Sequence, residues 1–220
     1  MTLRLLLVSM SLMVSYGFSS PSARYRPVLM RPSLVTRHMI FSTQSKTDRD
    51  QIVQQLLALS RRIGPVGSLA TVQDQHALEQ LAMTLEPLSD KNPTKRPLRG
   101  MHNLLYSAAP GGSSGRLAGP FYGKVTQDFV DDETFINAVQ FGPLQISLRA
   151  TRSVKTARRN MVRFCETTVR LFGQTIAQKE LGGGGVWDYI FIGEITDEDG
   201  TSKLIRVMKT PSLFVLEQNL

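Results

Sequence analysis

Few side chains in this 220-residue sequence are suited to acid–base or nucleophilic chemistry. Beyond residue 47 the histidines are His76 and His102, and the single cysteine of the chain is Cys165. Nucleophilic enzymes use cysteine–histidine pairs, but neither Cys165 nor His102 lies in a known nucleophile motif. We therefore interpret Cys165 as a buried structural thiol and expect no catalytic residues.

Metal and phosphate sites are not indicated either. The sequence has no CxxC or HxxxH spacing, which zinc sites commonly use. Residues 197–200, Asp-Glu-Asp-Gly, resemble a calcium loop superficially, but the EF-hand phase would put Ile195 and Arg206 at ligand positions. The run Gly182–Gly185 lacks the Lys-Ser/Thr that follows in a phosphate-binding loop. Both segments are predicted to be turns, and no metal or cofactor is expected.

Three polar residues interrupt apolar strand patterns and are more informative. Gln127, Asn137 and Arg206 each alternate with residues that we expect to face the core. Buried polar groups need hydrogen-bond partners, so these side chains form a structural polar network or hold the polar headgroup of a ligand.

Aromatic and aliphatic residues accompany them on the same predicted strands. Such side chains fill a core, or they line a pocket for an apolar ligand. Together with the three polar residues they make up a candidate ligand-binding site, which consists of Phe121, Val125, Gln127, Phe129, Asn137, Trp187, Tyr189 and Arg206.

From Met101 onward the apolar residues recur with a period of two, which predicts strands. Phe121, Val125 and Phe129 share one face, and Trp187, Tyr189 and Phe191 share one face opposite Ile190 and Ile192. About eight strands in succession without crossover helices favour an antiparallel sheet that closes on itself. The predicted strands are Asn103–Ala108, Phe121–Val130, Thr134–Phe141, Leu144–Ala150, Met161–Phe172, Trp187–Ile195, Lys203–Lys209 and Leu213–Gln218.

Two amphipathic helices are predicted before the strands, over Asp48–Ile63 and Thr71–Glu86. Asp48 is a candidate N-cap for the first helix, and Gly64-Pro65 ends it. We expect both helices to pack on the rest of the domain. Binding to a membrane surface is the alternative, but neither polar face is rich in Lys or Arg.

The first 47 residues differ from the rest of the chain, because they contain no acidic residue and six basic ones. Without them, 20 Lys and Arg remain against 18 Asp and Glu, so the net charge of +8 belongs mostly to this leader. No nucleic-acid partner is therefore expected. Residues 48–220 suit a single domain, with a helical region and linker at 48–97 and a β-barrel at 98–220.

The leader itself has two parts. Arg4 and the apolar run Leu5–Tyr16 are typical of a secretory signal peptide, and the run is too short for the ~20 residues that span a bilayer. Residues 18–47, rich in Ser, Thr and Pro with scattered Arg, are typical of a transit peptide. Phe18 at the junction resembles the aromatic residue in bipartite leaders of algae with complex plastids. Secretion and a mitochondrial presequence are the alternatives.

Several blocks of the remaining chain resemble the plastid lipid-associated protein (fibrillin) family. They are Leu85-Glu86, the Asn-Pro-rich linker Asn92–Pro97, the first strand Leu98–Ser107, Gly123–Gln127, Ile136–Val139, Ile205–Lys209 and Leu213–Leu216. The order and spacing of these blocks carry the resemblance, which spans about Gln51–Gln218. His102 stands where the family has tryptophan, Lys209 replaces an arginine, and Thr151–Leu181 matches poorly.

The resemblance implies a mainly β fold, in which two N-terminal amphipathic helices precede a lipocalin-like antiparallel β-barrel of about eight strands. It also implies a noncatalytic protein of the chloroplast, located in the stroma or at the surface of plastoglobules or thylakoids. Such proteins bind or sequester apolar lipids, namely carotenoids, prenylquinones or fatty acids. The expected partners are an apolar lipid or isoprenoid ligand and a peripheral membrane or plastoglobule surface.

Two other functions remain open. The protein could be a scaffold for an enzyme of a prenylquinone or carotenoid pathway, with that enzyme as its partner. It could also be a small barrel enzyme, which would require two titratable groups converging in a cavity, with His102 or Glu166 among them.

Overall fold

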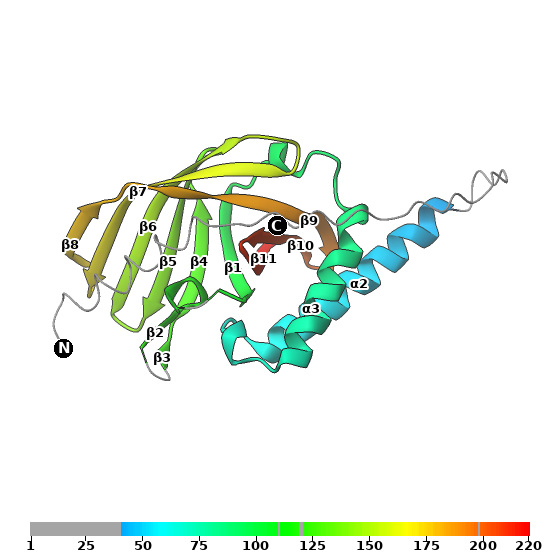
Figure 1. Cartoon of the computed structure of the whole chain (residues 1–220), viewed down its shortest axis with the longest axis horizontal. Helices are drawn as coiled ribbons and strands as arrows, with labels where there is room; N and C mark the ends of the chain where they lie inside the picture. Colours follow the sequence, from blue (N-terminus) through cyan, green and yellow to red (C-terminus); the bar gives the residue numbers. More distant parts are fainter. Residues whose placement is uncertain (1–40, 110, 119–120, 198) are drawn as a thin grey trace, which may run out of the picture.

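The computed structural model describes residues 41–109, 111–118, 121–197 and 199–220. Most of the predicted leader, residues 1–40, therefore lies outside the described part of the chain, as do the side chains of 41–45, 111, 112, 117, 118 and 121. Figure 1 shows a strongly curved sheet with a pair of helices packed against one side.

The two predicted helices are present. Helix α2 spans Phe41–Ile63 and helix α3 spans Val72–Leu85. Asp48 lies inside α2 and does not cap it, because no proline or glycine in residues 41–47 interrupts the helix. Thr71 caps α3, since its hydroxyl accepts a hydrogen bond from the backbone amide of Asp74 at 3.1 Å.

Nine strands form one antiparallel sheet in the order β6-β5-β4-β1-β11-β10-β9-β7-β8. A further pairing of β6 with β7 joins the two sides, so the first eight strands of this order form a closed ring. The strands are β1 (Gly100–Ser107), β4 (Lys124–Phe129), β5 (Thr134–Phe141), β6 (Leu144–Val154), β7 (Arg159–Leu171), β8 (Gln174–Glu180), β9 (Gly184–Thr196), β10 (Ser202–Thr210) and β11 (Ser212–Asn219).

Shorter elements connect these strands. The strands β2 (Arg116–Ala118) and β3 (Phe121–Tyr122) form a separate pair, so the predicted strand Phe121–Val130 is broken at Gly123. Gly184 and Gly185, predicted to be part of a turn, belong to β9 and pair with β7. The short 3₁₀ helices are η1 (Gly67–Leu69), η2 (Glu86–Leu88), η3 (Pro93–Lys95) and η4 (Gly111–Ser114).

The alternation along β10 separates two hydrophobic layers. Ile205 and Val207 pack with Leu56 of α2 and Leu78 of α3 on the outside of the ring. Leu204 and Met208, on the opposite face, pack with residues from the other strands in the ring interior. The helices thus cover the outer face of β9, β10, β11 and β1, where their apolar stripes are buried.

A bulge in β9 changes which residues face the interior. Val207 is opposite Phe191, but Met208 is opposite Tyr189, so Ile190 is the extra residue. Trp187 therefore faces the interior, Phe191 packs against the helices, and Ile192 turns inward. The expected shared face of Trp187, Tyr189 and Phe191 was wrong at Phe191.

The linker between the helices and β1 covers one end of the ring. The Thr94 hydroxyl donates to the backbone carbonyl of Thr156 or Ala157 in the β6–β7 hairpin, 3.0 Å away in each case. Arg96 forms an ion pair with Glu194 of β9, and the side chain of Leu98 is completely buried in the interior cluster. This end is therefore closed by residues 94–98. None of the described helices has the length and hydropathy needed to span a bilayer.

We predict that the contact between helices and ring contributes strongly to stability. Leu78→Ala should lower the free energy of unfolding by about 2–5 kcal/mol, because Leu78 is completely buried between α3 and the ring. Met83→Ala on the same helix is the control, since Met83 is 61% exposed, and should change stability by less than ~0.5 kcal/mol. Urea denaturation measures both; equal losses in the two variants would contradict the packing described.

Candidate ligand-binding site

Arg206 lies at the centre of a polar cluster inside the ring. Its side chain is completely buried and shares the inner face of β10 with Leu204 and Met208. Its Nη1 donates a hydrogen bond to Oε1 of Gln127 at 2.8 Å, and Nε2 of Gln127 donates to Oδ1 of Asn137 at 2.7 Å. The predicted polar network of Gln127, Asn137 and Arg206 is therefore present.

Aromatic rings surround the rest of this guanidinium. The Arg206 Cζ atom lies 5.0 Å from the ring centroid of Phe129, 5.7 Å from that of Trp187 and 5.8 Å from that of Tyr189. Trp187 also packs against Phe135, with ring centroids 4.6 Å apart. Ring faces attract a cation most strongly where water is excluded, so these contacts offset part of the cost of burying the charge.

A second guanidinium, that of Arg152 on β6, approaches the same aromatic group. Arg152 is 7% exposed, its Nε donates to the carbonyl of Asp132 at 2.6 Å, and its Cζ lies 5.4 Å from the Phe129 ring centroid. Among the described residues, no carboxylate lies within 4 Å of either guanidinium. Two buried positive charges thus share the ring interior without an ion-pair partner.

Several buried atoms of this cluster have no hydrogen-bond partner. Burial of an unpaired polar atom is costly, and such atoms are uncommon in folded proteins. In this cluster they are Nε of Arg206, Nη1 of Arg152, Nδ1 of His102 and Oδ1 of Asn160. Asn160 donates its Nδ2 hydrogen only to the hydroxyl of Tyr189, at 3.5 Å.

His102 is a neutral member of the cluster. Its Nε2 lies 3.0 Å from the carbonyl oxygen of Leu98, so the ring proton belongs on Nε2 and Nδ1 is an acceptor. Burial lowers the pKa of His102 to about 3, helped by the positive charge of Arg206 and opposed by the hydrogen bond to Leu98. Burial also lowers the pKa of Arg206, as does Arg152, whereas the nearby Tyr189 hydroxyl raises it; a guanidinium stays protonated in proteins.

Six of the eight predicted site residues come together in this cluster, namely Gln127, Phe129, Asn137, Trp187, Tyr189 and Arg206. Val125 is half-buried, shares its face of β4 with Gln127, and lies beside Gly115 toward the opposite end of the ring. The side chain of Phe121 lies outside the described residues.

Arg152 and Asn160 were missed because one predicted strand ended too early and the next began too late. The expected strand stopped at Ala150, yet one further step of its alternation, from Leu148 through Ala150, leads to Arg152. Asn160 directly precedes the predicted start of the next strand. His102 gave a clearer signal, since it is a polar residue at a strand position where the resembled family has tryptophan.

The residues considered for catalysis do not converge. Cys165 is half-buried at a bulge of β7, and Glu166 lies on the other face of that strand from Thr167, hydrogen-bonded to Gln178 at 2.6 Å. His102 faces the interior on β1 and contacts neither residue. No group of residues suited to hold a metal ion occurs in the described part of the chain.

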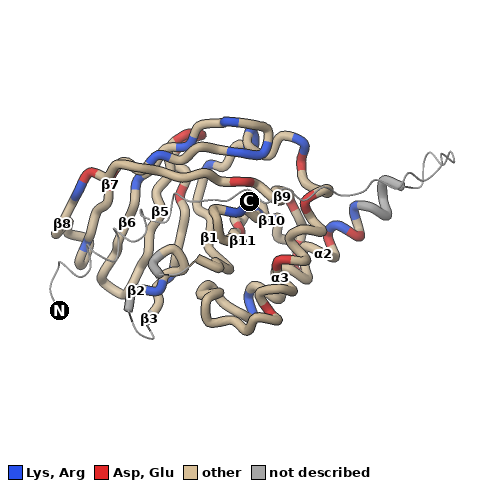
Figure 2. The backbone as a smooth tube through the Cα atoms, in the orientation of Figure 1, with Lys and Arg blue, Asp and Glu red and all other residues tan. Residues whose placement is uncertain are grey.

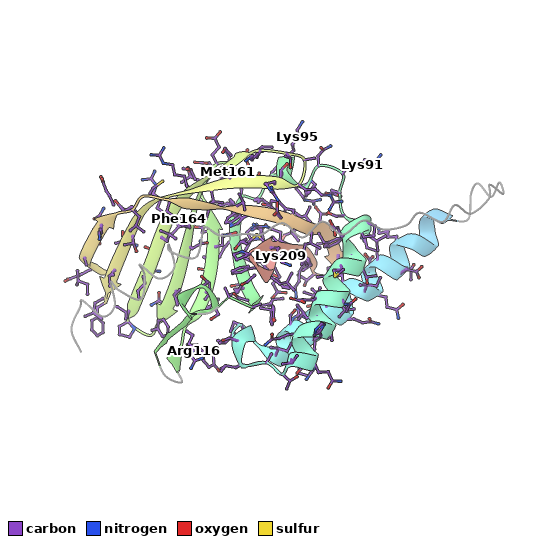
Figure 3. The ribbon with its side chains drawn as sticks, viewed as in Figure 1. Lys91, Lys95, Arg116, Met161, Phe164 and Lys209 are labelled. Atoms are coloured by element: carbon purple, nitrogen blue, oxygen red, sulfur yellow. The ribbon has the colours of Figure 1, made fainter. Side chains whose placement is uncertain are left out.

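A pocket of about 160 Å³ lies at the far end of β7 from the linker, lined by Thr167, Val169, Ala177, Gln178 and Lys179. Val169 packs with Ile146 there, on the inner face of β6 and β7. Phe164, labelled in Figure 3, lies on the same strand and packs against the interior cluster. The inner face of β7 therefore runs from the polar cluster to this pocket.

Basic residues gather at the β6–β7 hairpin (Figure 2), and two of them, Arg158 and Arg159, have structural partners. Arg159 forms an ion pair with Asp188, with Nε to Oδ1 at 2.5 Å. Arg158 donates to the backbone carbonyls of Ile190 at 3.2 Å and Glu86 at 3.1 Å. These contacts tie the hairpin to β9 and to the helical region, and we assign them no role in binding.

Comparisons with protein-family models, with curated proteins and with solved structures found no match for this chain.

We predict that His102 makes the protein sensitive to acid. Below about pH 6.5 the unfolded chain binds a proton on His102, whereas the folded protein does so only near pH 3. Between these values stability should fall by ~1.4 kcal/mol per pH unit as the pH decreases. His102→Phe removes this proton and should flatten the profile, while keeping an aromatic contact with Phe129.

Urea midpoints of both proteins, measured between about pH 7 and pH 5, test this dependence. Aspartates with a lowered pKa, such as Asp74 and Asp131, contribute at lower pH and equally in both proteins. Parallel profiles for the wild type and His102→Phe would show that His102 is not buried in its neutral form.

Proposed function

We propose that this protein is a noncatalytic lipid-binding protein, in which the closed ring is a lipocalin-like β-barrel that holds one apolar or amphipathic lipid. The observation that carries the proposal is the polar cluster around Arg206. Its unpartnered atoms lie deep inside a ring whose other inward residues are largely apolar. Packing alone leaves few such atoms in one place, whereas a lipid headgroup would supply partners for the two arginine donors among them.

The apolar part of the lipid has a place on the inner face beyond the cluster. Ile146 and Val169 face inward there, and Val125 and Leu144 are half-buried on the same side. An eight-stranded barrel is wide enough to hold one small ligand. The pocket of about 160 Å³ is smaller than a whole lipid and accommodates only part of a chain, so the tail extends from it toward Arg206.

Burial of the tail supplies the binding energy. Apolar surface removed from water contributes ~25 cal/mol per Å², so several hundred Å² give several kcal/mol before the costs of association. The polar cluster around Arg206 then fixes the orientation of the lipid and selects its class. A lipid with the wrong headgroup would leave buried polar atoms of the cluster without hydrogen-bond partners.

The segments that carry the family resemblance supply the headgroup cluster. Gln127 ends one such block, Asn137 lies in the next, and Arg206 lies in the closing pair of strands; His102 belongs to the first strand block. This convergence supports membership of the plastid lipid-associated (fibrillin) family. Membership of this family implies a location in the chloroplast, in the stroma or at the surface of plastoglobules or thylakoids.

Binding of a lipid inside the ring is tested with the full chain and tryptophan fluorescence. Trp187 is the only tryptophan, and it lies in the interior cluster. The methyl ester of stearic acid brominated at carbons 2 and 3 is a neutral lipid whose bromine atoms, next to the headgroup, quench a tryptophan on contact. We expect it to quench Trp187 emission in a saturable titration.

The matched control moves the tryptophan to the surface. In the double variant Trp187→Phe with Phe172→Trp the indole replaces a side chain that is 80% exposed at the β7–β8 turn. This protein should show no saturable quenching at the same ester concentrations. Quenching of both proteins alike would indicate lipid adsorbed on the outside, and the absence of quenching in both would contradict a lipid-binding interior.

The natural ligand class follows from incubating the full chain with a total plastid lipid extract, followed by mass spectrometry of what remains bound. A stoichiometric fatty acid, carotenoid or prenylquinone is the expected result. A folded protein that retains no lipid would contradict the proposal and favour a scaffold that binds a pathway enzyme.

A further inference from the structure

We infer that the lipid bound inside the ring carries a carboxylate headgroup, which Arg206 and Arg152 bind together. This inference rests on the proposed function and narrows it to one class of ligand, a single-chain fatty acid in its ionised form.

The first reason is an imbalance of charge inside the ring. Arg206 and Arg152 are both buried and positive, His102 is neutral at ordinary pH, and no described carboxylate pairs with either arginine. A buried charge without a counter-ion is expensive, and each of these two positive charges disfavours the other. A ligand with one negative charge relieves both effects.

Four acidic residues on the surrounding strands and turns are engaged elsewhere. Asp131 accepts hydrogen bonds from the backbone amides of Glu133 and Thr134 at the β4–β5 turn. Asp188 pairs with Arg159, Glu194 with Arg96, and Glu217 with Arg61. These carboxylates bind groups at the β4–β5 turn, at the end of the ring covered by the linker and on the outer side of the ring, and none of them forms an ion pair with the two arginines.

The second reason is the set of free donors. Arg206 has a buried Nε and Arg152 a buried Nη1, and neither hydrogen has an acceptor. The two guanidinium groups lie over the ring of one residue, Phe129, with centroid distances of 5.0 and 5.4 Å. A carboxylate has two oxygens that accept hydrogen bonds from guanidinium groups with good geometry, so one headgroup satisfies donors from two strands.

Other headgroups fit this cluster less well. A quinone carbonyl or a hydroxyl accepts a hydrogen bond but leaves both charges uncompensated. A phospholipid brings a negative phosphate, but its two acyl chains exceed the single small ligand that an eight-stranded barrel holds. Asn160 Oδ1 and His102 Nδ1 are acceptors, and they require water or another donor beside the carboxylate.

The test compares dibrominated stearic acid with its methyl ester, using Trp187 quenching in the full chain. The two ligands share the tail and differ in the charge of the headgroup. We expect the acid to bind about ten-fold more tightly or better, since hydrogen bonds to charged groups are the strong ones. Arg206→Met should abolish this preference and leave binding of the ester. Arg149→Met, which removes an exposed arginine three residues before Arg152, should leave the preference unchanged.

A second variant keeps the test valid if Arg206→Met fails to fold. Gln127→Glu has nearly the same shape and puts a carboxylate next to Nη1 of Arg206. If Arg206 lacks a counter-ion, Gln127→Glu should raise the melting temperature of the lipid-free protein. It should also weaken binding of the acid to the level of the ester, because the charge is already compensated.

The outcomes separate this inference from the proposed function. Equal affinity for acid and ester in the wild type would overturn the carboxylate headgroup while a lipid-binding interior stands. Quenching by neither ligand would overturn both. A lower melting temperature in Gln127→Glu together with an unchanged preference for the acid would also overturn the carboxylate headgroup. In competition with the brominated acid, tighter binding of octadecyl phosphate than of stearic acid would overturn it as well.

Discussion

The buried positive charge of Arg206 is the constraint on which the interior of this protein depends. Side chains along β10 point alternately to the outside and the inside of the ring, and this alternation directs Arg206 inward. Ile205 and Val207 on either side of it pack beneath α2 and α3, so the arginine between them must point into the ring. Gln127 and three aromatic rings surround its guanidinium there. The helices thus determine the chemistry of the interior indirectly, by burying the outer face of the strand that carries Arg206.

The residues around Arg206 in the ring interior are arranged to accommodate its buried charge. The Phe129 ring centroid lies 5.0 Å from Cζ of Arg206 and 5.4 Å from Cζ of Arg152. The ring also contacts His102, Phe135 and Trp187, so one aromatic residue connects β4 to β1, β5 and β9. The linker residue Leu98 closes the nearby end and supplies the carbonyl that orients His102. The side chains at this end are buried, and a low local dielectric strengthens the electrostatic interactions there. A ligand headgroup placed among these residues would therefore be bound strongly and selectively.

Much of this arrangement could be predicted from the period-two pattern. The strand Thr134–Phe141 has its predicted bounds, and the network of Gln127, Asn137 and Arg206 follows from polar residues at inward positions. What failed depends on information that the pattern does not contain. The bulge at Ile190 reversed the expected faces of Phe191 and Ile192, and β8 was not predicted because its mostly polar, exposed residues pair with β7 alone. Arg152 and Asn160 were missed because β6 and β7 extend beyond their apolar segments. An arginine that follows an apolar segment has the same sequence pattern whether it continues the strand into the interior or marks the end of the strand.

The most direct measurement of the central claim is the ionisation of a bound fatty acid, followed by nuclear magnetic resonance of an isotope-labelled carboxyl carbon. Two positive charges beside a carboxylate lower its pKa, so the resonance of the bound lipid should stay at the ionised position as the pH falls through the range in which free fatty acid titrates. Replacement of Arg206 by methionine should bring that titration back toward the free value. A bound carboxyl group that titrates in the wild type as it does in solution, or at higher pH, would contradict a headgroup bound between Arg206 and Arg152.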